Sequence, residues 1–251
     1  MTNTKRIIAL ITGVSSERDM GTAICRKLAS KGIDIFFTHW QSEVGWADKF
    51  QKELLEVGVR CESLSVDLSH ANAANILLDA TSTNLGFPSI LVNNAAHSTS
   101  DGYLKLNAKT LDDHYAVNMR STFLLCTEYA RRFEKLKMNM GRIINMTSGQ
   151  ELGPMPNELA YVATKGAISA FTKSLSVEVA RLGVTVNAVN PGPTDSTWMT
   201  EEIRRHLLPK FLLGRIGMPE DAARLVAFLA SDDAEWITGQ VIHSEGGFYR
   251  G

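Results

Sequence analysis

Residues 7–29 read Ile7-Ile8-Ala9-Leu10-Ile11-Thr12-Gly13-Val14-Ser15-Ser16-Glu17-Arg18-Asp19-Met20-Gly21-Thr22-Ala23-Ile24-Cys25-Arg26-Lys27-Leu28-Ala29. This stretch begins as an apolar strand, passes through a turn that contains glycine and continues as a helix. Such a turn directs backbone N–H groups and the positive end of the helix toward an anion. The pattern indicates binding of a dinucleotide pyrophosphate, although an ordinary strand-to-helix loop would also fit it.

Short apolar runs alternate with helical segments along the rest of the chain. Runs that are apolar throughout predict strands buried on both faces, as in a parallel sheet covered by helices. We expect strands at residues 6–11, 34–38, 60–65, 89–93, 141–147, 185–190 and 241–243, and helices at 21–31, 44–56, 71–84, 110–137, 159–182 and 219–230. This order predicts a single α/β domain over residues 1–251, a doubly wound (Rossmann) fold with a mostly parallel seven-stranded sheet and helices on both faces.

The composition argues against several other classes of protein. The chain has 251 residues, of which 44% are hydrophobic and 21% charged, with a formal net charge of −1. A charge this small gives no attraction to nucleic acid. No stretch approaches the roughly 20 apolar residues of a membrane span. Three scattered cysteines lack metal-ligand spacing, which favours reduced thiols, a cytoplasmic location and no metal site.

Tyr161 and Lys165 lie four residues apart in an expected helix, with Ser148 thirteen residues upstream of the tyrosine. One helical turn places the phenol and the ammonium on the same face. A nearby cation favours the phenolate, so we expect Lys165 to lower the pKa of Tyr161. Ser148 follows an apolar strand and could polarise a substrate oxygen. The combination suits interconversion of a carbonyl and an alcohol, whereas the bare pair also occurs by chance in many helices.

Taken together, these motifs resemble the short-chain dehydrogenase/reductase family over nearly the whole chain. The matching residues, in order, are Thr12-Gly13 with Gly21, Asp67-Leu68, Asn93-Asn94-Ala95-Ala96, Asn118, Ser148, Tyr161 with Lys165, and Asn190-Pro191-Gly192. The end of the chain is similar to the subgroup that contains 3-oxoacyl-carrier-protein reductases, through residues 214–221, 237–240 and Gly246-Gly247.

The resemblance implies a nicotinamide dinucleotide site built from several loops. Asp67 would accept from the adenine amino group, although it could instead be a turn aspartate before Ser69. The Pro191-Gly192 turn would lie under the nicotinamide. The full set of implied cofactor-binding residues is Gly13, Ser15, Ser16, Arg18, Met20, Thr38, His39, Asp67, Leu68, Asn94, Ala95, Tyr161, Lys165, Pro191, Thr194 and Ser196.

The same resemblance implies the catalytic residues Asn118, Ser148, Tyr161 and Lys165. Tyr161 would exchange a proton with the substrate oxygen, and Ser148 would hydrogen-bond that oxygen. Lys165 would also bind the nicotinamide ribose. In the family, an asparagine at the position of Asn118 holds a water that connects the lysine to solvent protons. A simple backbone contact is the alternative role for Asn118.

The phosphate loop departs from the family pattern. Two extra residues separate Gly13 from Gly21, and Asp19 stands where the family has a middle glycine. A carboxylate there would repel the phosphates unless it points away. We expect Asp19 to cap the following helix, while Ser15, Ser16 and amides near Met20 meet the pyrophosphate. Ala96 in place of a family glycine is a mild change.

The choice of cofactor depends on the end of the second strand. A carboxylate there would bind the ribose hydroxyls and repel a 2′-phosphate, but this chain has Thr38-His39-Trp40-Gln41. Arg18 lies where relatives that prefer NADP often carry a basic residue, and an arginine suits a phosphate. The sequence therefore favours NADP(H), with NAD(H) possible. The alternative for Arg18 is a solvated loop residue.

The substrate is expected to be a small carbonyl compound or an acyl thioester. Residues 194–213 should form an apolar lid, which fits a hydrophobic ketone or an acyl chain such as that of a 3-oxoacyl thioester. Apolar outer faces on the two long helices favour a homo-oligomer, a dimer or homotetramer. Two alternatives remain. One is enoyl reduction, disfavoured because such relatives usually place tyrosine and lysine seven apart. The other is a non-catalytic dinucleotide sensor.

Overall fold

The computed structural model describes residues 6–250, so residues 1–5 and 251 of the expected domain lie outside the described residues. Its sheet has seven strands in the order β3-β2-β1-β4-β5-β6-β7, and every neighbouring pair is parallel. The strands are β1 (Ile8–Ile11), β2 (Asp34–His39), β3 (Cys61–Ser65), β4 (Ile90–Asn93), β5 (Gly141–Met146), β6 (Val184–Asn190) and β7 (Val241–His243). The predicted fold class is confirmed.

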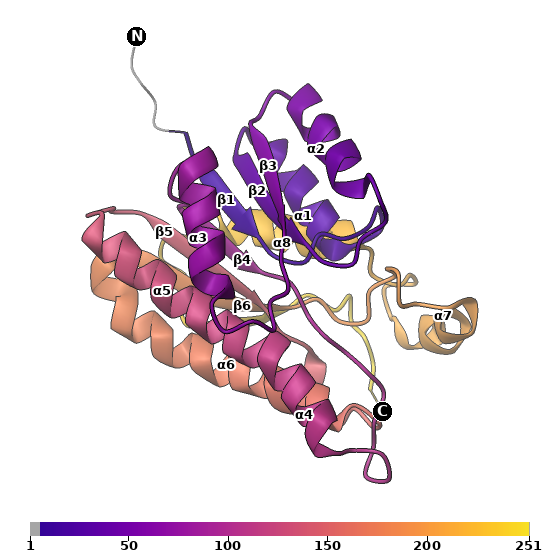
Figure 1. Cartoon of the computed structure of the whole chain (residues 1–251). Helices are drawn as coiled ribbons and strands as arrows, with labels where there is room; N and C mark the ends of the chain where they lie inside the picture. The colour runs from indigo at the N-terminus through magenta and orange to yellow at the C-terminus, as the bar shows by residue number, and fades with distance from the viewer. Residues whose placement is uncertain (1–5, 251) are drawn as a thin grey trace.

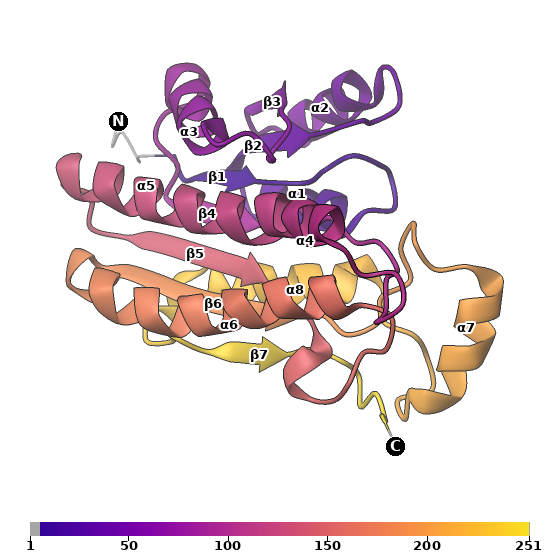
Figure 2. The ribbon, with the colours of Figure 1, turned by 60° about the horizontal axis from the view of Figure 1, so that its bottom comes forward.

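Helices cover both faces of the sheet (Figures 1 and 2). One face packs against α1 (Met20–Ala29), α2 (Trp46–Glu56) and α8 (Pro219–Leu229). The other packs against α3 (Ala73–Asn84), α5 (Ser121–Lys135) and α6 (Leu159–Val179). Two separate apolar clusters, one on each face, exclude water from the strands. This arrangement explains why the strands read as continuous apolar runs in the sequence.

The expected single helix over residues 110–137 is interrupted. It begins as α4 (Ala108–His114), passes through a π-helical segment (Tyr115–Arg120) and continues as α5. Single π-turns within α-helices are uncommon and occur frequently at functional sites. Asn118 lies inside this segment and is fully buried. The apolar periodicity of the sequence continues through the segment, so the interruption could not be predicted from that pattern.

The segment expected to be the lid, residues 194–213, contains α7 (Glu201–Leu207) and a short 3₁₀ helix (Leu208–Lys210). Figure 2 shows α7 beyond the carboxyl ends of the strands. Met199 and Phe211 are buried in a small apolar cluster with Ile216. The other expected apolar lid residues are not all packed, since Leu212 is 73% exposed. Part of this apolar surface is therefore available to a ligand.

Other expectations concerned membranes, metals and cysteines. None of the helices described within residues 6–250 is long and apolar enough to cross a membrane. In the same range, no group of three or more His, Cys, Asp or Glu side chains is placed to hold a metal ion. The three cysteines are free and buried.

Asp101, in the loop after β4, holds the start of α6. Its carboxylate accepts hydrogen bonds from the backbone amides of Leu159 at 2.7 Å and Ala160 at 2.8 Å. The first amides of a helix have no partner within the helix. Because Tyr161 follows directly, Asp101 fixes both the helix start and the orientation of the tyrosine.

We therefore predict that Asp101→Ala lowers the free energy of unfolding by about 1–2 kcal/mol, the usual effect of losing an N-terminal cap. Urea denaturation followed by circular dichroism measures this change. Asp112→Ala, which removes an exposed aspartate from α4, is the matched control and should leave stability unchanged. Equal stability of both variants would contradict the capping role.

Candidate active site

A groove of about 750 Å³ crosses the carboxyl ends of the strands, where the loops after β1 to β4 meet. The strand order reverses between β1 and β4, and ligands of doubly wound sheets bind at such a point. The groove is lined by many of the expected cofactor residues: Gly13, Ser15, Met20, Thr38, His39, Asp67, Leu68, Asn94, Ala95 and Ser196. It is also lined by residues without an assigned role, among them Trp40, Gln41, Val66, Ser69, His97 and Val117.

Two glycines allow the loops after β1 and β4 to touch. Gly13 has φ of +74°, and a Cβ there would lie 2.6 Å from the Cα atom of Ala95. A Cβ at Gly21 would lie 2.8 Å from Nδ2 of Asn94. That amide donates to the carbonyls of Thr12 and Gly13 at 3.0 and 2.8 Å. This close backbone approach, together with the size of the groove, fits a dinucleotide.

Asp19 does not cap α1 with its side chain, contrary to the sequence-based expectation. It occupies the N-cap position, but its carboxylate turns back into the loop. There it accepts from the backbone amide of Ser15 at 2.8 Å and the hydroxyl of Ser16 at 2.7 Å. The two extra residues give the loop enough length for this closure. The carboxylate remains at the groove, where it would face the phosphates.

The side chains of Ser15, Ser16 and Arg18, all expected at the cofactor, are hydrogen-bonded within the protein. The hydroxyl of Ser15 bonds to the backbone of Trp40, and that of Ser16 bonds to Asp19. Arg18 does not line the groove as the structure describes it and donates instead to Asp195 at 3.0 Å, at the start of the expected lid. The amides of the first turn of α1, beginning at Met20, have no partner within the helix and are available to an anion at this end of the groove.

Several other expected cofactor residues use their side chains to hold the loops. Thr38 is 2% exposed, and its hydroxyl accepts from the amide of Gly13 at 3.3 Å. Asp67 accepts from the amide of Ser69 at 2.8 Å, which is the turn role considered from the sequence. The hydroxyl of Thr194 donates to the carbonyl of Gly192 at 3.1 Å. These residues shape the groove, and only some of them present free polar groups to it.

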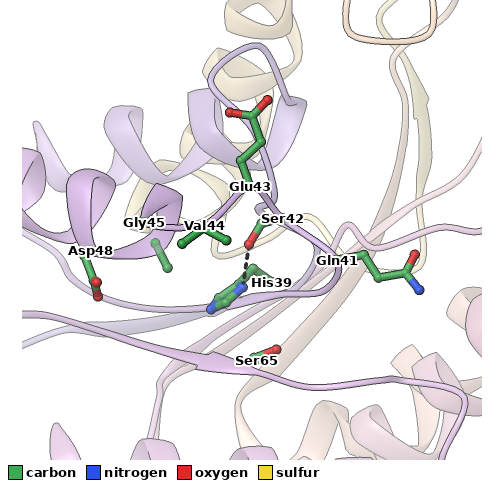
Figure 3. Close-up of a pocket in the computed structure, with 9 residues that line it drawn as sticks. His39, Gln41, Ser42, Glu43, Val44, Gly45, Asp48 and Ser65 are labelled. Carbon is green, nitrogen blue, oxygen red and sulfur yellow. Dashed lines mark hydrogen bonds between the residues drawn. The ribbon is translucent and has the colours of Figure 1, made fainter.

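His39, at the end of β2, borders a second cavity of about 370 Å³ next to the groove. Figure 3 shows its Nδ1 atom facing the hydroxyl of Ser42, at 2.9 Å. Burial lowers the pKa of His39, and the negative charge of Asp48 partly opposes this. Asp48 and Glu43 also line the cavity, but the carboxylate of Glu43 points away from the imidazole in Figure 3.

The expected catalytic residues do come together, at the junction of β5 and α6. Ser148 follows β5, and its hydroxyl donates to the sulfur of Met155 at 3.8 Å. The same hydroxyl lies near enough to the phenol of Tyr161 to act on its pKa. Lys165 is 2% exposed. Its Nζ atom lies 5.5 Å from the centroid of the Tyr161 ring and donates to the carbonyl of Met146 at 2.8 Å.

The pKa of Tyr161 differs from the sequence-based expectation. Burial and the negative charge of Glu158 raise it to about 12, although the nearby Ser148 hydroxyl has a lowering effect. Burial also lowers the pKa of Lys165 to about 8. The ammonium points to Met146 rather than to the phenolic oxygen, so removal from water dominates the titration of both groups. Tyr161 therefore keeps its proton throughout the neutral range.

Asn118 connects this cluster to the loop after β4. Its side-chain oxygen accepts from the amide of His97 at 2.6 Å, and its Nδ2 atom donates to the carbonyl of His97 at 2.8 Å and the hydroxyl of Thr164 at 3.1 Å. The backbone-contact role considered from the sequence is thus observed. Thr164 precedes Lys165 in α6, so Asn118 fixes the groove wall relative to the expected catalytic helix.

The groove and the cluster of Ser148, Tyr161 and Lys165 both lie at the carboxyl ends of the strands, although none of these three residues lines the groove itself. Residues 13–249 match the family described as Enoyl-(Acyl carrier protein) reductase. The chain belongs to the short-chain dehydrogenase/reductase family. Members of this family are NAD(P)-dependent oxidoreductases that act on CH–OH and C=O groups, and this chain is one of them.

Individual members of the short-chain dehydrogenase/reductase family are similar over the whole chain. "Uncharacterized oxidoreductase YjdA" of Bacillus subtilis is 69% identical, with 100% of both chains covered. A 3-oxoacyl-[acyl-carrier-protein] reductase of Haemophilus influenzae is 36% identical and covers 96% of this chain and 98% of its own. The structure of acetoin dehydrogenase from Enterobacter cloacae is 30% identical, with a TM-score of 0.86 and coverage of 98% and 96%.

The position of Asp19 predicts that its charge opposes the cofactor. Asp19→Asn should keep the bond to the Ser15 amide while removing the repulsion. We expect the Kd of NADPH and of NADH to fall by roughly fivefold, the effect of about 1 kcal/mol between charges in water. Fluorescence titration measures both constants, with Asp112→Asn as the control. An unchanged Kd would show that the carboxylate does not face the phosphates.

Proposed function

We propose that this chain is an NADPH-dependent carbonyl reductase that also runs as an alcohol dehydrogenase. The observation that carries the proposal is the gathering of the Ser148 hydroxyl and the buried ammonium of Lys165 around the phenol of Tyr161. When bound, the nicotinamide supplies or accepts the hydride. The residues Asn118, Ser148, Tyr161 and Lys165 are assigned to catalysis.

The proposed roles follow from the protonation states. Tyr161, with a pKa of about 12, is a protonated donor that gives its proton to the carbonyl oxygen as the alcohol forms. Ser148 hydrogen-bonds the same oxygen and holds it in line. Lys165, with a pKa of about 8, is mostly charged at neutral pH. It stabilises the phenolate that remains and binds the ribose hydroxyls, and Asn118 supports a water that returns the proton.

NADP(H) is the proposed cofactor, and NAD(H) is the second candidate. No carboxylate occupies Thr38 to Gln41, so the end of β2 itself has no group that repels a 2′-phosphate, although Glu43 and Asp48 line the adjacent cavity. The cavity beside His39 and Ser42 offers an imidazole and a hydroxyl, both of which can donate to phosphate oxygens. We rest the proposal on this cavity rather than on Arg18, because Arg18 is paired with Asp195.

We propose two candidate classes of substrate, and the first is a 3-oxoacyl thioester. The 3-oxoacyl reductases among the relatives support it, and exposed leucines of the segment 194–213 offer an apolar surface for its acyl chain. A small hydroxyketone or diketone is the second, supported by the likeness to acetoin dehydrogenase. The four-residue separation of Tyr161 and Lys165 argues against enoyl reduction. The assembled catalytic cluster argues against a non-catalytic sensor.

The same proposal includes the cellular location and the oligomeric state of the enzyme. We place it in the cytoplasm as a homotetramer or dimer, without nucleic-acid or membrane partners. Exposed apolar side chains on the outer faces of α5 and α6 support self-association, with Leu124 39% and Val177 78% exposed.

A screen of NADPH oxidation over 3-oxoacyl thioesters, diketones, quinones and sugars tests the reaction. With the best substrate, Tyr161→Phe should lower kcat by about a hundredfold or more, since it removes the proton donor. Cofactor Kd should remain near that of the wild-type protein. Residual turnover within about tenfold of wild type would exclude Tyr161 as the acid.

Cofactor choice is tested at His39. His39→Asp should weaken NADPH binding by about tenfold or more, because a carboxylate repels the 2′-phosphate, while Arg18→Gln should have the smaller effect. A phosphate prefers protonated imidazole, and burial lowers the pKa of His39, so the preference for NADPH over NADH should rise as pH falls from about 7 to about 5. A preference independent of pH, or a larger loss in Arg18→Gln, would contradict the assignment.

A further inference from the structure

The C-terminal segment ends in an enclosed ion pair. Arg250 donates from Nη1 to Oε2 of Glu245 at 2.6 Å, and its Nη2 atom contacts Oε1 of the same carboxylate. The side chain of Glu245 is only 8% exposed and that of Arg250 is 21% exposed. The guanidinium also stacks 5.0 Å from the ring of Phe248. Such a bidentate pair fixes orientation as well as charge.

This ion pair lies between the two turns that flank the reaction centre. Oε1 of Glu245 accepts from Nδ2 of Asn190 at 2.7 Å, and the oxygen of that amide accepts from the backbone of Gly192 at 3.0 Å. A Cβ at Gly192 would lie 3.0 Å from Cβ of Glu245. Glu245 therefore packs on the turn expected under the nicotinamide.

Arg250 packs on the other turn, the one that follows Ser148. A Cβ at Gly149 would overlap Nη2 of Arg250 and lie 3.1 Å from Oε1 of Glu245, and one at Gly153 would lie 3.0 Å from Cδ of Arg250. Figure 2 shows the C-terminus close to the loop that follows β5. A methyl group at Gly149 would force the end of the Arg250 side chain to move, whereas one at Gly153 would shift it by only a few tenths of an ångström.

The same segment contacts the expected lid. The amide of Tyr249 donates to the carbonyl of Lys210 at 2.8 Å. Phe248 packs on Phe211 with ring centroids 5.0 Å apart. Residues 245–250 thus contact the serine turn, the nicotinamide-side turn and the lid together, although these parts are far apart in the sequence.

The charges of Glu245 and Arg250 satisfy one another, so the guanidinium of Arg250 is not free to bind an anionic substrate. Removing one member would leave the other enclosed without its partner, which is strongly unfavourable. A buried ion pair of this kind contributes orientation more than stability. The role of the ion pair is therefore to hold the turn after Ser148 and the Asn190–Gly192 turn in a fixed relative position.

We propose that Glu245 and Arg250 are positioning residues, forming a C-terminal clamp that fixes Ser148 relative to the Asn190–Gly192 turn. The clamp acts on the catalytic site of the proposed function and rests on that function for its kinetic consequence. It contacts the two turns rather than the substrate. Losing it lets the serine and the nicotinamide-side turn drift apart, which slows the chemical step without removing any reacting group.

The test compares Arg250→Gln, Glu245→Gln and the charge-conserving Arg250→Lys. Arg181→Gln is the matched control, because it breaks an Arg–Glu pair that is 76% and 53% exposed near the end of α6. Kinetics use the carbonyl substrate on which the wild-type protein is most active with NADPH. We expect kcat to fall by about tenfold to a hundredfold in both glutamine variants, with the substrate KM nearly unchanged. Arg250→Lys should recover most of the loss.

Hydrogen–deuterium exchange gives a readout that does not depend on turnover. Arg250→Gln should speed exchange in residues 148–153 and 190–193 but not in α5, and Arg181→Gln should change neither turn. If the glutamine variants do not fold, Gly149→Ala serves in their place, because its methyl group displaces Arg250 while both charges remain. Gly149→Ala should lower kcat and speed hydrogen–deuterium exchange in residues 148–153, as the glutamine variants do.

Unchanged kcat together with unchanged exchange at the two turns would overturn the clamp, even if the melting temperature fell. A wild-type protein that reduces no carbonyl compound would refute the proposed function instead, and the exchange experiment would still decide whether the clamp exists.

Discussion

The burial of one ammonium group constrains the rest of the site. Lys165 is 2% exposed, and its Nζ atom has the carbonyl of Met146 as its hydrogen-bond acceptor. A buried charge must keep its partner, because losing it costs several kcal/mol. The side of α6 that carries Lys165 is therefore held against the end of β5. The hydroxyl of Thr147 adds a second hydrogen bond between these elements, to the backbone carbonyl of Lys165 at 3.1 Å. Ser148 and Tyr161 meet because their two elements are joined here.

The surrounding loops are organised around the same junction. Asn118 ties the wall of the groove to α6, Asp101 holds the start of that helix, and Asn94 joins the loops after β1 and β4. Each of these side chains satisfies backbone groups that would otherwise lack partners at the ends of strands and helices. The groove is thus preorganised by internal hydrogen bonds. The residues that shape it are mostly distinct from those that face a ligand.

Much of this arrangement could be predicted from the sequence. The buried inner strands follow from their apolar runs, whereas the half-buried edge strand β3 has polar residues at three of its five positions. Ser148, Tyr161 and Lys165 follow from spacing and family resemblance. Properties that depend on tertiary contacts could not be predicted. Burial raises the pKa of Tyr161 where the sequence predicted a lower value. The longer loop allows the Asp19 carboxylate to accept from the Ser15 amide, and Arg18 donates to Asp195. Gly246-Gly247 marked the C-terminal segment, but nothing in the pattern showed that Arg250 reaches Gly149.

The central claim is that a dinucleotide lies in the groove with its nicotinamide beside Tyr161. A crystal structure of the complex with NADPH tests it most directly. We expect the nicotinamide between the Pro191-Gly192 turn and the phenol, with the ammonium of Lys165 at the ribose hydroxyls and the 2′-phosphate near His39. A dinucleotide bound elsewhere, or a nicotinamide directed away from Tyr161 and Ser148, would contradict the account.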